Sequence, residues 1–348
     1  MEALMWEALW CGDDEKLEEI FTTHPELMGE VDGIEGGPLR VAASAGRTFV
    51  VKIFVKLGAK IDTCTPSGTA MHAAAGGGHD EFIRELAHAD PTLIDKATES
   101  GITPLFCAAS NGHASTIETL VRLGSKSIDS PSGSGATPMH RAAFYGHVRA
   151  IETLVRLGSQ AIDTPELYGD TPLHIAARKR YPLVIKTLVR LGSLAMNTKN
   201  KLGGTPLSEA VSSGSVEAVA MCIQLGSTSI DTPCLRNTTP MKLAAAYGFV
   251  EIVELLARFG SRFVDETYEI DIQVVMSVYS PYLKCLRTIF ALSRIQTEPV
   301  QRNIQEHLDE EFVLNVRYRV YFAHSLVSKL LFSLKRNRRE LFLNKNIC

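Results

Sequence analysis

Apolar positions between residues 135 and 168 follow helical spacing twice and then lose it. Thr137 and Pro138 suit a helix start, because a threonine hydroxyl caps free backbone N–H groups and proline is well tolerated at the first helical position. Gly146 suits a left-handed residue that ends this helix. A second helix, ending at Gly158, is predicted by apolar residues at Ile151, Leu154, Val155 and Leu157. Turn residues follow from 159 to 170 and predict an extended loop or hairpin, called the finger below.

The same unit recurs along the chain every 34 residues. The step is marked by the prolines of Thr-Pro pairs at Pro104, Pro138, Pro172, Pro206 and Pro240, and by LVRLGS segments beginning at Leu120, Leu154 and Leu188. One unit cannot bury its own apolar face, but stacked units can. The sequence therefore predicts one continuous array, although 348 residues would otherwise suggest two or three compact domains.

The segments TPMHRAAFYGH (137–147) and TPLHIAA (171–177) resemble the ankyrin repeat. The resemblance implies an all-α fold with short hairpin fingers, an ankyrin-repeat α-solenoid followed by a C-terminal helical segment. Residues 1–36 resemble a degenerate N-terminal capping repeat, with Ala8, Leu9 and Gly12 on the template. The seven matching units cover 37–266, at about 37–66, 67–98, 101–131, 135–165, 169–199, 203–233 and 237–266.

Three departures from the pattern carry physical predictions. Arg180 stands where other units have glycine, and a left-handed arginine costs on the order of 1 kcal/mol relative to glycine. Ser208 and Lys242 replace the histidine of TPLH, so the histidine-dependent contacts at those two helix starts are expected to be absent.

Composition excludes several classes of protein. With 36 basic and 39 acidic residues the formal net charge is −3, which gives no indication of nucleic-acid binding. Seven widely spaced cysteines without a CxxC argue against a disulfide framework and a structural zinc site, and favour a reducing compartment. The first residues lack the basic region of a signal peptide, and no stretch is long and apolar enough to span a membrane.

No residue pattern indicates catalysis, a metal or a cofactor. Six of ten histidines occupy repeat positions, where we expect them to bond neighbouring turns. Gly76 to Gly78 lack the Lys-Ser/Thr of a phosphate-binding loop, and Cys107 has no visible base beside it. We therefore predict a non-enzymatic scaffold for protein–protein interaction.

The family's partner-contacting positions are the finger tips and the two residues after the alanine pair. Carried over by the resemblance, they give a candidate site on the concave face of the array: Phe144, Tyr145, Leu167, Tyr168, Arg178, Lys179, Lys201, Leu202, Leu235, Arg236 and Tyr247. Aromatic and cationic residues meet in the middle of this set, which favours an acidic or phosphorylated peptide as partner. Alternatively, the aromatic side chains pack against neighbouring fingers and the cations are merely solvated.

Residues 267–348 lose the repeat and predict helices with a basic tail that includes Lys335 and Arg339. Three interpretations compete: a cap over the last repeat, a docking module that would make the protein an adaptor, and a membrane-surface helix, as in a bacterial effector. The cap is favoured and membrane contact is the least favoured. An enzyme in this segment is a further alternative, against which no nucleophile–base pair is found. The expected location is the cytoplasm, of its own cell or of a host cell.

Overall fold

The computed structural model describes residues 1–29, 37–234, 238–259 and 261. It divides into two units, residues 1–240 and the residues from Met241 onward, which are described separately. The predicted segment 267–348, with its alternatives, lies outside the described residues. None of the helices in the described ranges is long and apolar enough to cross a membrane.

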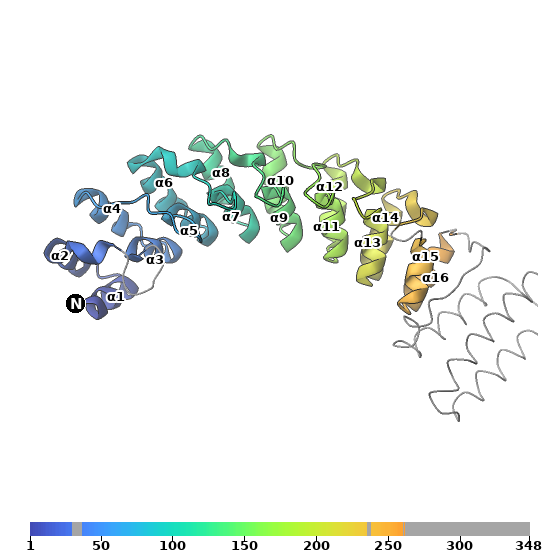
Figure 1. Cartoon of the computed structure of the whole chain (residues 1–348), viewed down its shortest axis with the longest axis horizontal. Coiled ribbons are helices and arrows are strands. Elements are labelled where there is room, and N and C mark those ends of the chain that lie inside the picture. The colour runs from blue at the N-terminus through green and yellow to red at the C-terminus, as the bar shows by residue number, and fades with distance from the viewer. Residues whose placement is uncertain (30–36, 235–237, 260, 262–348) are drawn as a thin grey trace, which may run out of the picture. The chain divides into compact units, whose positions relative to one another are not determined.

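The first unit consists of helix pairs in which an inner helix is followed by an outer one (Figure 1). The inner helices are α1 (Glu2–Cys11), α3 (Gly37–Ala45), α5 (Ala70–Gly77), α7 (Pro104–Asn111), α9 (Pro138–Tyr145), α11 (Pro172–Arg178) and α13 (Pro206–Ser213). The outer helices are α2 (Asp14–Thr23), α4 (Phe49–Lys56), α6 (Asp80–Ala89), α8 (Ala114–Arg122), α10 (Val148–Arg156), α12 (Pro182–Arg190) and α14 (Val216–Gln224). The second unit holds one further pair, α15 (Pro240–Ala246) and α16 (Val250–Arg258).

Each inner helix from α3 to α11 packs between its two inner neighbours, and the outer helices form a parallel row (Figure 1). The core is continuous because every pair contributes to it. In the pair α9–α10 the buried residues include Met139, Ala142, Ala143, Ile151 and Leu154. The small alanines let neighbouring inner helices approach closely. The stacked array predicted from the repeat is thus confirmed.

The predicted caps form as expected. Thr137 begins α9, and Gly146 ends it in the left-handed conformation at φ 80°. Arg180 has φ 64° and is the only non-glycine residue with positive φ in the described part of the chain, as its place in a glycine position predicts. The cost is compatible with the fold because Pro182 starts α12 two residues later.

The fingers contain turns rather than paired strands. Short 3₁₀ helices open them, namely η2 (Pro91–Asp95), η3 (Ser127–Asp129), η4 (Ala195–Asn197) and η5 (Ser229–Asp231), and η1 (Pro25–Met28) follows α2. At the tip between α10 and α11, Glu166 N donates to Asp170 O at 2.9 Å and Gly169 N donates to Glu166 O at 2.8 Å. In the described residues the only β-bridge is an isolated one between Thr65 and Gly68, since the segments are too short to continue the pairing.

Candidate protein-binding surface

The histidines that invited a metal or catalytic interpretation link successive units. His140 accepts from Thr137 N at Nδ1 (3.1 Å), so its proton is on Nε2, which donates to Asp170 O of the next finger at 3.1 Å. Burial lowers the pKa of His140 to about 4 and lowers those of His72 and His174. Ser208 keeps only the first of these bonds, accepting from Thr205 N at 2.8 Å, as the absence of a histidine predicts.

A second set of bonds shows which inner-helix positions correspond to one another. His79, His113 and His147 donate to the carbonyl oxygens of Ser44, Gly76 and Ser110, each at about 3.0 Å. Arg47 makes the same bond at 2.7 Å to the carbonyl oxygen of Trp10. Trp10 therefore occupies in α1 the position that Ser44, Gly76 and Ser110 occupy in α3, α5 and α7.

The surface formed by this position, by the residue three before it and by the residue after it is called the inner-helix face below. Its most prominent feature is a cluster on α9. The Arg141 guanidinium lies 5.2 Å from the Phe144 ring centre and 4.8 Å from that of Tyr145, and it donates to the Tyr145 hydroxyl at 3.0 Å. Lys179 Nζ lies 3.9 Å from the Phe144 ring centre. Phe144 is thus held between two cations.

Neither Arg141 nor Lys179 forms an ion pair with a carboxylate in the described ranges. Arg178 differs, because it contacts Asp170 at 2.6 Å and Glu209 at 2.8 Å. Burial works to lower the pKa of Arg178, but the bond and charge of Glu209 outweigh it, so the pKa is raised. The positive charge of Arg178 is therefore already compensated within the array, and the open cations of the cluster are Arg141 and Lys179.

The finger tips present the second group of predicted residues. Leu167, Tyr168 and Leu202 are each more than half exposed. Successive tips are tied by backbone bonds, in which Leu167 N donates to Ser134 O (3.1 Å) and Lys201 N donates to Tyr168 O (3.0 Å). Their side chains are therefore displayed at a fixed spacing.

The structure divides the predicted site residues into four groups. Phe144, Tyr145 and Lys179 meet in the α9 cluster, whereas Arg178 serves a structural ion pair. Leu167, Tyr168, Lys201 and Leu202 lie at finger tips; Leu235 and Arg236 lie outside the described residues; Tyr247 follows α15 in the second unit, 5.6 Å from Phe249 between ring centres. Both sequence interpretations hold in part, because Phe144 packs against cations whereas Tyr145 and Tyr168 are exposed.

Sequence reasoning missed three members of the inner-helix face. Arg141 was treated only as a filler of a variable position, yet it organises the cluster. Glu7 and Trp10 were not considered, although Ala8, Leu9 and Gly12 already placed them on the repeat template. Extending the carry-over to the degenerate first unit would have found both.

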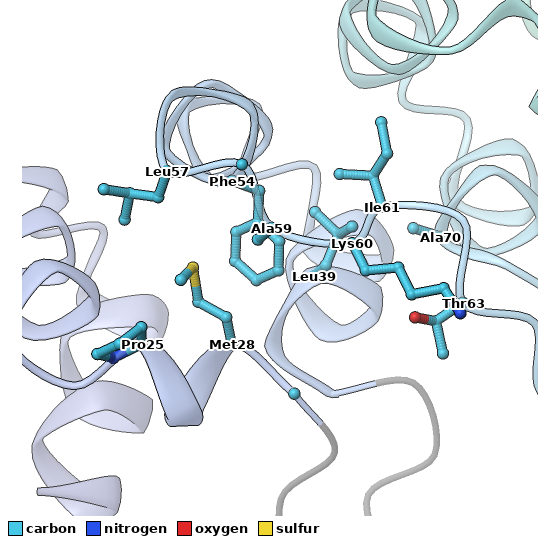
Figure 2. Close-up of a pocket in the computed structure, with 12 residues that line it drawn as sticks. Pro25, Met28, Leu39, Phe54, Leu57, Ala59, Lys60, Ile61, Thr63 and Ala70 are labelled. Carbon is cyan, nitrogen blue, oxygen red and sulfur yellow. The ribbon is translucent and has the colours of Figure 1, made fainter.

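The remaining chemical candidates offer no catalytic arrangement. Burial raises the pKa of Cys107 to about 11 and of Cys222 to about 12, so both are neutral thiols near pH 7. No group of three or more metal-ligating side chains occurs within the described ranges. A cavity of about 430 Å³ lies beside η1 and α4, lined mainly by apolar residues such as Met28, Phe54 and Ile61 (Figure 2). Lys60 is the one charged residue among those that line it.

Comparison with known proteins agrees with this geometry. The family model "Ankyrin repeats (3 copies)" matches residues 39–130, 71–164, 125–198 and 173–267. These matches cover most of the chain, so the protein belongs to the ankyrin repeat family. The ankyrin repeat domain of human ASB11 is similar in structure, with a TM-score of 0.57 and 24% identity over 66% of this chain and 100% of that one. None of the curated proteins that were compared matches the chain.

Proposed function

We propose that the protein is a binding scaffold whose inner-helix face and finger tips around α9 and α11 hold an acidic protein segment. Arrays of this family generally bind other proteins, and stacked repeats supply an extended surface for doing so. The single observation that carries the finer proposal is the position of Phe144 between Arg141 and Lys179, two cations without carboxylate partners in the described residues.

The chemistry of this cluster suits carboxylate or phosphate oxygens. Arginine offers several N–H donors in a plane, and lysine adds a compact charge. Aromatic rings beside them supply contact area at little entropic cost, as in binding hot spots. Tyr145 and Tyr168 are 44% and 62% exposed, so they are accessible to a partner.

Affinity capture from cell extract tests the proposal. The full chain is compared with a Tyr145→Ala/Lys179→Glu double variant and with Arg149→Glu, a charge reversal at an exposed cation on the outer helix α10. We expect a dominant ligand that the double variant loses and the Arg149→Glu control retains. Equal recovery by all three proteins would place the interface elsewhere.

The absence of enzymatic activity and a cytoplasmic location stay predictions. The adaptor and effector alternatives rest on residues 267–348, outside the described residues, and no observation in the described part favours them over a scaffold.

A further inference from the structure

The first repeat carries the chemical mirror image of the α9 cluster. Glu7 and Trp10 occupy in α1 the positions that Arg141 and Phe144 occupy in α9, as the Arg47 bond to the Trp10 carbonyl shows. Residues three apart on a helix are neighbours, and in α9 this pair is in contact at 5.2 Å. The Glu7 carboxylate and the Trp10 indole therefore share one patch on α1.

This patch is open to a partner. Trp10 is 60% exposed, and Glu7 is exposed and forms no ion pair within the described part of the chain. A carboxylate beside an indole suits a lysine or arginine side chain, which gains an ion pair and a cation–π contact together. The α9 cluster has the opposite preference, since its open charges are Arg141 and Lys179.

The inner-helix face between the two patches is low and uncharged. The position of Trp10 and Phe144 is filled by Ser44, Gly76 and Ser110 in the intervening repeats. The position of Glu7 and Arg141 is filled by Val41, Ala73 and Cys107. These small side chains leave the backbone of a bound segment free to pass close to the helices from α3 to α7.

We propose that this face binds one extended segment of bipolar charge, with a basic side chain on Glu7 and Trp10 and an acidic one on Arg141 and Lys179. The inference rests on the proposed function and adds the second anchor, the sign of each charge and the distance between them. Helices α1 and α9 are four inner-helix steps apart (Figure 1). At about 8–10 Å a step they are separated by roughly 32–40 Å, which an extended chain covers in about 10–12 residues.

Selection from a phage-displayed library of random 16-residue peptides on the immobilised full chain tests the inference. We expect enriched peptides to carry Lys or Arg about ten residues from Asp or Glu. A labelled enriched peptide should bind Glu7→Lys, Trp10→Ala and Lys179→Glu at least tenfold more weakly than the unaltered protein. Arg149→Ala and Leu183→Ala, at an exposed cation and an exposed apolar residue of outer helices, should bind it unchanged.

Two other results separate the inference from the function on which it rests. Acidic peptides that depend on Lys179 but bind Glu7→Lys and Trp10→Ala normally would overturn the bipolar segment and leave the proposed function standing. Enrichment no greater than on a Glu7→Lys/Lys179→Glu double variant would overturn both. Thermal melts of every variant confirm that lost binding is not lost folding.

Discussion

The outer helices and the inner-helix face belong to the same repeats but place their side chains in different contacts. On the outer side, Arg156 pairs with Glu118 and Arg190 pairs with Glu152, each reaching one repeat back. Below them, Asp129 accepts from the Ser159 hydroxyl and from Gln160 N at 2.8 Å. The arginine and serine of LVRLGS are thus interface residues, and their identity from unit to unit is what a repeated contact requires.

On the inner-helix face the corresponding positions differ from unit to unit and mostly face solvent. Phe144, Tyr145 and Lys179 contact one another or water, and none belongs to the bonds that repeat at each step. Variation is therefore tolerated on this side and is used for display. The comparison predicts that changes on the outer or buried side reduce stability, whereas changes on the inner-helix face reduce binding.

The largest loss of stability is expected for His140→Ala. The substitution leaves Thr137 N and Asp170 O without their buried partner and opens a cavity, which costs about 3 kcal/mol. Urea unfolding measures the change. His140→Ser, which copies Ser208, should restore part of it by capping Thr137 alone; no difference between the two variants would contradict the cap.

Acidification should weaken the same contacts. The pKa of His140 is lowered to about 4 by burial, below its ordinary value of 6.5, so the unfolded chain binds a proton at higher pH than the folded one. The stabilisation is complete above pH 6.5 and is lost as the pH falls toward 4. Urea midpoints from pH 7 to 4.5 should fall less steeply in His140→Ala, and NMR titration reports the pKa directly; parallel slopes would disprove the link.

Arg178→Ala should be the exception on the inner-helix face. It removes the partner of the buried Asp170 carboxylate, whose other bond comes from Asn200 at 2.7 Å. Because Arg178 is 41% exposed, the cost is about 2 kcal/mol rather than that of a fully buried pair. Chemical denaturation gives the value. A variant as stable as the unaltered protein would return Arg178 to the set of free cations.

Asp129→Ala should lower the free energy of unfolding by about 1–2 kcal/mol, since two charge-assisted bonds to the next repeat are lost. The chain supplies its own control: Asn197 accepts the same pair of bonds, from Ser227 Oγ at 3.3 Å and Thr228 N at 2.9 Å. Asp129→Asn should therefore cost less than Asp129→Ala in the same urea titration.

The smallest effect is expected for Lys179→Ala and Tyr145→Ala, whose free energies of unfolding should change by less than about 0.5 kcal/mol. Both side chains make only surface contacts in the cluster. Calorimetric melts check this. A loss above about 2 kcal/mol would place these residues in the scaffold and remove the contrast between the two sides.

The repeat period predicted the fold because every unit repeats the same local signals. Thr137, Pro138 and Gly146 fix helix ends through backbone chemistry that needs no distant contact, and Arg180 adopts the left-handed conformation that its position required. The form of the fingers was less accessible, since a short run of turn residues fits a hairpin and a 3₁₀ turn equally well.

The site was predicted only as a set of positions. Which cation is open depends on residues far apart in the sequence: Asp170 and Glu209 compensate Arg178, whereas Lys179 reaches Phe144 from the next helix. Such pairings follow from stacking geometry, and no spacing in the sequence encodes them. Trp10, by contrast, was within reach of the template and needed only a looser match.

The cross-repeat ion pairs of the outer helices stop at one boundary. Where Arg190 and Glu152 set the pattern, the next step offers Gln224 and Lys186, and Asn197 stands in for the aspartate. Two of the three fasteners between α12 and α14 are therefore weakened at the same place. Under tension the array has a preferred line of rupture there, and the segment from α1 to α12 would part from α13 and α14 as one piece.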